Sequence, residues 1–198
     1  SSASRPCWGG GGRRKLKGME KLEALKRLFP GKVDLSESER LRHGKDEGYP
    51  EARPVLAVVY PEGVEDVQKA LRWAREWGVA VIPFGAGTSL EGHLYPVREA
   101  ISLDLSRMNR VLEVRPQDFS CVVEPGLTRK ALNQALKGTG LFFPVDPGAD
   151  ASLGGMAATN EAVEAADKWV NLAPPRCATG GCGRTSSPSR WSWQAARS

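Results

Sequence analysis

Residues 83–93 read Pro-Phe-Gly-Ala-Gly-Thr-Ser-Leu-Glu-Gly-His and overlap the end of an apolar run at residues 79–84. That run is short and rich in β-branched residues, which predicts a buried strand. Glycine permits positive φ and close approach of the backbone to a ligand, and successive amide N–H groups can hold an anion. Thr88 and Ser89 add hydroxyl donors suited to phosphate oxygens. The stretch therefore predicts a loop that binds pyrophosphate.

Two common phosphate-binding patterns do not fit this loop. The P-loop requires Lys and then Ser or Thr after its last glycine, where this chain has His93 and Leu94. The dinucleotide fingerprint requires a third glycine where Leu90 stands. Since a glycine-rich turn after a strand can also be purely structural, the loop alone does not identify its ligand.

A second stretch of small residues lies at residues 146–160, Asp-Pro-Gly-Ala-Asp-Ala-Ser-Leu-Gly-Gly-Met-Ala-Ala-Thr-Asn. Gly154 and Gly155 permit close approach of a flat or charged ligand. A wall built from such residues packs poorly unless something fills the space beside it. The two stretches together therefore favour a ligand site.

The elements around the first loop predict a strand, helix and strand in parallel. Apolar runs at residues 55–60 and 79–84 flank an amphipathic helix at residues 64–77, whose stripe includes Val67 and Leu71. Gly78 is expected to end that helix.

The elements after the loop predict a second, antiparallel part. Strands are expected at residues 100–105, 111–114 and 120–124, followed by a helix at residues 128–137. The fold class is therefore α+β, with two small α+β lobes in series.

Three motifs carry a family resemblance: residues 81–93, 122–126 and 142–160. Together they resemble the FAD-binding domain of the vanillyl-alcohol oxidase and p-cresol methylhydroxylase (PCMH-type) superfamily. Within it the chain is most similar to the branch that holds D-lactate dehydrogenase and the D subunit of glycolate oxidase. The resemblance covers residues 49–160 and implies two α+β subdomains with FAD extended between them, the second subdomain being truncated.

The resemblance also implies a set of cofactor-binding residues. The first loop would hold the pyrophosphate, and the second stretch would line the adenosine and flavin side. The expected residues are Pro83, Phe84, Gly85, Ala86, Gly87, Thr88, Ser89, Leu90, Gly92, His93, Pro147, Gly148, Ala149, Ser152, Leu153, Gly154, Gly155, Ala158, Thr159 and Asn160.

The mode of attachment is expected to be non-covalent. Some members of the superfamily attach flavin to a histidine in the first loop, and the resemblance places Thr88 at that position. His93 lies five residues later and is expected at the rim of the cavity.

The branch implies oxidation of a 2-hydroxy acid, of the glycolate or D-lactate type, with hydride transfer to FAD and with possible partner oxidase subunits. The substrate-side groups of these enzymes lie in a C-terminal cap domain, which this chain lacks, so we name no catalytic residue. Two alternatives stay open: a truncated remnant that does not turn over substrate, and an FAD domain of another reductase in the superfamily, such as that of cell-wall precursor synthesis.

The two ends of the chain differ from the middle in composition and hydrophobic pattern. Residues 1–18 predict a disordered or leader-derived segment, and residues 19–48 a helical lead-in that starts at Met19. Residues 161–198 lose hydrophobic periodicity, and we interpret them as an aberrant tail read in a shifted frame. A basic arm bearing Trp191 and Trp193, for RNA or a membrane, is the alternative.

Composition and the cysteine pattern bear on partners, metal sites and location. The net charge of +5 is concentrated near the ends, so we expect no nucleic-acid partner. The four cysteines show no zinc or disulfide spacing, and no metal site is predicted. Without a signal peptide or a transmembrane segment in the sequence, we expect a cytoplasmic protein.

Overall fold

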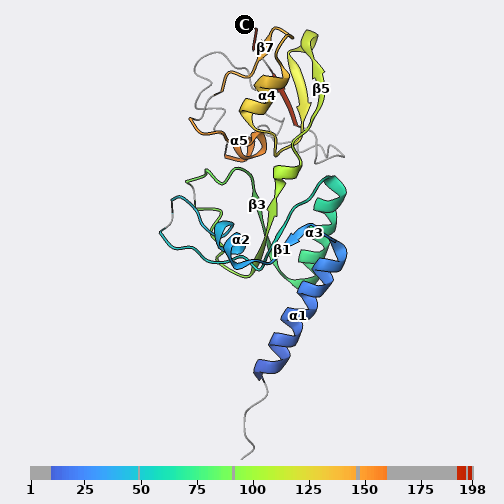
Figure 1. Ribbon diagram of the computed structural model, residues 1–198, viewed down its shortest axis with the longest axis vertical. Helices are drawn as coiled ribbons and strands as arrows, with labels where there is room; N and C mark the ends of the chain where they lie inside the picture. The colour runs from blue at the N-terminus through green and yellow to red at the C-terminus, as the bar shows by residue number, and fades with distance from the viewer. Residues whose placement is uncertain are drawn as a thin grey trace, which may run out of the picture.

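A computed structural model describes the chain as two lobes that follow one another along its long axis (Figure 1). The described residues are 10–48, 50–90, 92–145, 148–159, 191–194 and 196–197. No helix in this part of the chain has the length and hydropathy that a membrane span needs. The two lobes have separate sheets, in agreement with the prediction of two α+β lobes in series.

The first lobe is built on a four-stranded sheet in the order β1-β2-β4-β3. Its strands are β1 (Val33–Asp34), β2 (Ala57–Val59), β3 (Ala80–Phe84) and β4 (Ala100–Asp104). β4 pairs in parallel with both β2 and β3, whereas β1 is antiparallel to β2. The assignment of residues 100–105 to the antiparallel part was therefore wrong. Every residue of β4 is buried, as expected for a central strand of a covered parallel sheet.

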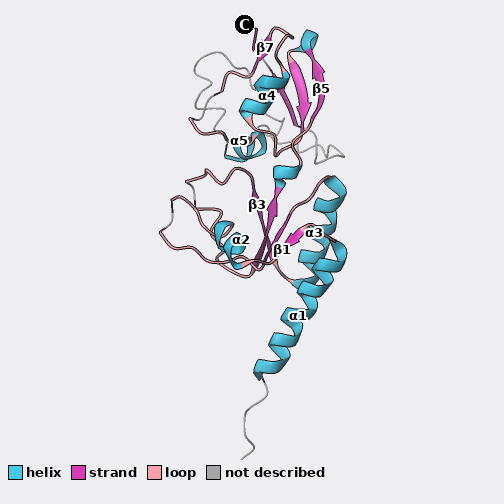
Figure 2. Ribbon diagram, viewed as in Figure 1, coloured by secondary structure: helices cyan, strands magenta, loops and turns pink. Residues whose placement is uncertain are grey.

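Helices cover both faces of this sheet. α1 (Gly10–Leu28) and α3 (Val64–Trp77) lie on one side, and α2 (Glu37–Arg42) lies on the other (Figure 2). Phe29, Trp73 and Ile101 belong to the buried cluster between α1, α3 and the sheet. α3 ends at Gly78, whose φ of 65° is left-handed, as the sequence predicts.

The first helix begins earlier than expected. α1 starts at Gly10, so residues 10–18 are helical where the sequence predicted disorder. Extending an existing helix by one residue costs far less than nucleating one, and this stretch contains good helix formers among its Lys, Arg and Leu residues. Residues 1–9 lie outside the described part of the chain.

β3 occupies the edge of the sheet and is less buried than expected. Its residues 80–82 are half-buried and Pro83 is exposed, while Phe84 is buried. An edge position tolerates Pro83, because proline has no N–H to donate to a further strand.

The second lobe is antiparallel, as predicted. β5 (Val111–Arg115) pairs with β6 (Ser120–Val123). Two 3-10 turns, η1 (Leu105–Arg107) and η2 (Pro116–Asp118), precede and join these strands. α4 (Arg129–Ala135) begins after Thr128, whose hydroxyl accepts a hydrogen bond from the Ala131 amide at 3.3 Å. β7 (Leu141–Phe142) and α5 (Leu153–Thr159) follow.

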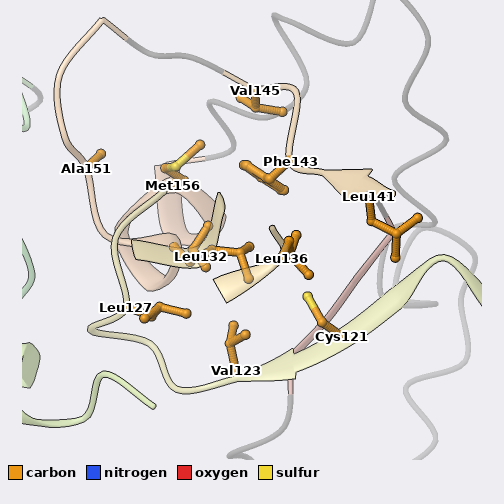
Figure 3. Packing of buried hydrophobic residues seen from close by; sticks show 11 residues of the cluster. Cys121, Val123, Leu127, Leu132, Leu136, Leu141, Phe143, Val145, Ala151 and Met156 are labelled. Atoms are coloured by element: carbon orange, nitrogen blue, oxygen red, sulfur yellow. The ribbon is translucent and has the colours of Figure 1, made fainter. Parts of the chain in front are cut away.

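The core of this lobe lies between β6, α4 and α5. Figure 3 shows Val123, Leu132, Phe143 and Met156 directed toward one another. Leu132 and Met156 have no exposed surface. α5, which carries part of the second glycine-rich stretch, is therefore anchored by apolar packing.

Two further strands come from the end of the chain. β8 (Trp191–Gln194) pairs antiparallel with β6, and β9 (Ala196–Arg197) pairs with β7. The sequence predicted no regular structure here. Trp191, Ser192, Trp193 and Gln194 alternate apolar and polar over one short strand, and the open edge of β6 offers unpaired N–H and C=O groups. Residues 161–190, on which most of the shifted-frame interpretation rests, lie outside the described residues.

Replacement of Leu132 by alanine tests the role of the second core. Leu132 is fully buried, so Leu132→Ala leaves a cavity and is expected to lower the free energy of unfolding by about 2–5 kcal/mol. Urea unfolding followed by circular dichroism measures this. Leu112→Ala is the matched control, because Leu112 is 48% exposed, and an equal loss in both variants would contradict the assignment of the core.

Candidate functional site

A cavity of about 410 Å³ lies where the two glycine-rich stretches meet, between the lobes. Residues 83–89 and His93 line it from the first lobe, and residues of the 151–159 segment line it from the second. The sequence predicted a slot between these stretches, and the structure brings them together. Its volume lies in the range typical of small-molecule and cofactor sites.

Contact between the two stretches depends on glycine at residue 85. A Cβ atom on Gly85 would lie 2.2 Å from the hydroxyl oxygen of Ser152. A Cβ atom on Gly155 would lie 3.0 Å from the same oxygen, which accepts a hydrogen bond from the Gly155 amide at 3.3 Å. Gly85 therefore allows the lobes to approach each other at the site, while Gly155 leaves room for the Ser152 hydroxyl within the second lobe.

The second stretch docks on the segment that follows β6. The amide of Gly154 donates to the Pro125 carbonyl at 2.8 Å, and the amide of Leu153 donates to the Leu127 carbonyl at 2.8 Å. A Cβ atom on Gly154 would lie 2.6 Å from the Pro125 Cβ. The motif at residues 122–126 thus supports the cavity wall from behind.

The same motif closes on the connection between the lobes. The Gly126 amide donates to the Met108 carbonyl at 2.8 Å, and a Cβ atom on Gly126 would lie 1.9 Å from the Leu105 carbonyl oxygen. Leu105 and Met108 themselves line the cavity. The floor of the cavity is therefore part of the connection between the lobes.

An ion pair between Glu124 and Arg110, here called the Glu124 lock, stabilises this region. The Glu124 carboxylate accepts from the Arg110 guanidinium at 2.7 and 3.1 Å and from the Arg110 amide at 2.9 Å. The hydrogen bonds from Arg110 hold the pKa of Glu124 below its usual value, although burial opposes the shift. Glu124 is therefore a buried carboxylate with a structural partner.

An apolar wall of the cavity comes from the amphipathic stripe on α3, for which the sequence analysis named no packing partner. Val64, Val67 and Leu71 line the cavity, and Leu71 is 50% exposed. The buried residues of α3 are instead Ala70, Trp73 and Ala74, one face further round the helix. Periodicity cannot distinguish a face that packs on a sheet from one that lines a cavity, which is why this wall was missed.

Most of the predicted site residues line the cavity. They are Pro83, Phe84, Gly85, Ala86, Gly87, Thr88, Ser89, His93, Ser152, Gly154, Gly155, Ala158 and Thr159.

The other predicted site residues lie elsewhere. Leu90 is 70% exposed, and Leu153 is buried in the second core and does not line the cavity. Gly92, Gly148 and Ala149 do not line the cavity. Pro147 and Asn160 lie outside the described residues.

A buried histidine below the first loop was not anticipated. His43 has no exposed surface, its Nε2 lies 2.8 Å from the Asp104 carboxylate, and its Nδ1 lies 2.9 Å from the Glu39 carbonyl. Burial raises the pKa of Asp104, but hydrogen bonds from His43 and Ser106 outweigh burial and hold it below its usual value. Both ring nitrogens of His43 therefore face oxygen acceptors.

The family of the chain follows from comparison with known proteins. The model of the FAD-binding domain family matches residues 55–169, more than half of the chain. The chain therefore belongs to the FAD-binding domain family, as the motifs indicated. The match extends beyond residue 160, where the sequence analysis placed the departure from the family.

A protein of Danio rerio named probable mitochondrial D-lactate dehydrogenase is 44% identical over 128 residues. The alignment covers 65% of this chain and 26% of that protein, so the chain spans about a quarter of the relative's length.

Solved structures give the same fold. The match to an alkyldihydroxyacetonephosphate synthase covers 71% of this chain and 29% of the synthase chain, with a TM-score of 0.66 and 26% sequence identity. A p-cresol methylhydroxylase with substrate bound matches 75% of this chain and 29% of its own, with a TM-score of 0.56 and 20% identity, which shows the fold alone.

The residues present fit the cofactor that the family implies. The first loop has left-handed glycine at Gly87, with φ of 73°, and the hydroxyl of Thr88 at the cavity wall, which suit a diphosphate. The apolar wall formed by Val67, Leu71 and Met108 suits the face of a flat ring. The cavity thus has donors for the anionic part of FAD and an apolar surface for an aromatic part.

Gly85→Ala tests the contact between the lobes. The added methyl group meets the Ser152 hydroxyl, so we expect affinity for FAD to fall about tenfold or more, the equivalent of about 1.4 kcal/mol. Titration followed by flavin fluorescence measures the affinity. Adding Ser152→Ala removes the opposing oxygen and is expected to restore part of the affinity for FAD. A double variant that binds FAD no more tightly than Gly85→Ala would count against the steric explanation.

Acid titration tests the Glu124 lock. Because the folded-state pKa of Glu124 is lowered from 4.5, its stabilisation is present above pH 4.5 and is lost as pH falls through the folded-state value. Urea unfolding between pH 7 and pH 3 should show a steeper loss of stability for the unmodified chain than for Glu124→Gln. Parallel curves for the two would refute the lock.

Proposed function

We propose that this chain is the cofactor-binding portion of a flavin-dependent oxidoreductase that acts on 2-hydroxy acids of the D-lactate or glycolate type, with FAD held non-covalently. The observation that carries the proposal is the cavity in which the two glycine-rich stretches face each other. Membership of the FAD-binding domain family and similarity to a protein named D-lactate dehydrogenase support it.

The residues of the chain would bind and orient the cofactor. The backbone amides of residues 85–89 and the hydroxyl of Thr88 would hold the diphosphate, while Ser152, Gly154 and Gly155 would face it from the second lobe. Val67 and Leu71 would exclude water from the apolar part of the cofactor. When bound, FAD supplies the acceptor for the hydride that leaves the hydroxyl-bearing carbon of the substrate.

Non-covalent binding is supported by the chemistry of the cavity wall. Thr88 lines the cavity, and its neutral hydroxyl is a poor nucleophile. His93 also lines the cavity and is exposed, which agrees with a position at the rim.

The catalytic groups for substrate would come from outside this chain. The alignment covers 26% of the Danio rerio relative, which leaves room for a substrate domain in the whole protein. Partner oxidase subunits stay a prediction. A cytoplasmic location also stays a prediction, and the Danio rerio relative is named as mitochondrial.

Titration of the purified chain with FAD tests the proposal. We expect saturable quenching of flavin fluorescence at one FAD per chain, and binding at least about tenfold weaker for riboflavin, which lacks the diphosphate and its charge-assisted hydrogen bonds. Acid precipitation of the loaded chain should release all flavin into the supernatant. Flavin retained in the pellet would contradict non-covalent attachment.

Absence of binding would favour the alternative of a remnant that does not hold FAD. The substrate class is tested on the whole protein by anaerobic bleaching of the flavin. D-lactate or glycolate is expected to bleach it, whereas L-lactate serves as the control of opposite configuration. A flavin that stays oxidised with both expected substrates would exclude this class.

A further inference from the structure

We propose that residues 43–48 and 50–53, here called the brace, are positioning residues that hold the first glycine-rich loop in its binding conformation before the cofactor arrives. This inference rests on the proposed function for the identity of the ligand. The brace belongs to the first lobe, precedes β2 in the sequence, and contacts the loop on both sides of the cavity-lining residues 85–89.

The first contact fixes the start of the loop. The His43 ring lies 4.2 Å from the Phe84 ring, centroid to centroid, and His43 is itself held by Asp104 at 2.8 Å. A Cβ atom on Gly87 would lie 2.7 Å from Cζ of Phe84. His43 therefore positions Phe84, and Phe84 in turn supports the left-handed turn at Gly87.

The second and third contacts fix the far side of the loop. A Cβ atom on Gly48 would lie 2.3 Å from the carbonyl oxygen of Leu90, so the two backbones touch. Asp46 is fully buried, and its carboxylate accepts from the Gly48 amide at 2.9 Å and from the Leu94 amide at 3.3 Å. One carboxylate thus ties the brace and the loop together.

The last contact holds the segment that follows the loop. The Arg53 guanidinium donates to the carbonyls of Pro96 at 3.3 Å and Val97 at 3.1 Å. The Arg53 amide donates to the Gly44 carbonyl at 3.1 Å, which makes the brace a closed turn.

These contacts matter because of the composition of the loop. Glycine loses more conformational freedom on ordering than any other residue, so an unsupported loop would spend cofactor binding energy on becoming ordered. Contacts that order the loop beforehand raise affinity without touching the ligand. No brace residue lines the cavity, so the role assigned to the brace is positioning.

Hydrogen exchange of the cofactor-free chain tests the brace without FAD. Asp46→Ala removes both acceptors for the Gly48 and Leu94 amides, and we expect the Leu94 amide to exchange about tenfold faster. Asp46→Asn retains one acceptor oxygen and should be intermediate. Asp34→Ala is the matched control, since Asp34 also accepts from a backbone amide, that of Ser36 at 2.7 Å, away from the loop.

Affinity for FAD is measured on the same variants, together with the thermal midpoint of the cofactor-free chain. We expect about tenfold weaker binding for Asp46→Ala, about threefold for Arg53→Met, and no change for Asp34→Ala. Arg53→Met is included because Arg53 is exposed, so we expect its replacement to leave the thermal midpoint unchanged.

Unchanged exchange at Leu94 in Asp46→Ala, or equal losses of affinity in Asp46→Ala and Asp34→Ala, would overturn the brace. An unmodified chain that does not bind FAD would instead defeat the proposed function, while the exchange data would still decide on the brace.

Discussion

The close approach of Gly85 to Ser152 is the constraint on which the rest of the site depends. A methyl group on Gly85 would clash with the Ser152 hydroxyl, so the two lobes could not lie as close together at the cavity. Behind each side stands a support: the apolar core around Leu132 and Met156 holds α5, and the sheet of the first lobe holds the strand that leads into Gly85. The second core and the first sheet together therefore hold the two sides of the cavity in place.

Recognition at this site relies on backbone more than on side-chain charge. The loops contribute amides, glycines and hydroxyls, whereas the charged groups nearby, such as Glu124 and Asp104, are paired with partners of the protein. Such a surface suits a ligand that brings its own negative charge and its own reactive ring. These two carboxylates therefore stabilise the protein around the cavity.

The sequence predicted the two lobes, the end of α3 at Gly78 and both glycine-rich stretches, because these depend on local signals such as periodicity and positive φ. It misplaced β4, since strand order depends on which apolar face each strand shares with a distant neighbour. It did not predict that Leu71 lines the cavity, and it overlooked His43. Both depend on tertiary position, which short-range patterns do not encode.

The order of strands along the chain has a consequence for assembly during synthesis. Every strand of the first sheet lies between Val33 and Asp104, so that lobe can form once those residues have been made. The second sheet also includes β8, so pairing Trp191–Gln194 with β6 joins segments that are far apart in the sequence, at an entropic cost. The wall of the cavity from the first lobe can therefore form before the wall from the second lobe, whose lining residues extend to Thr159.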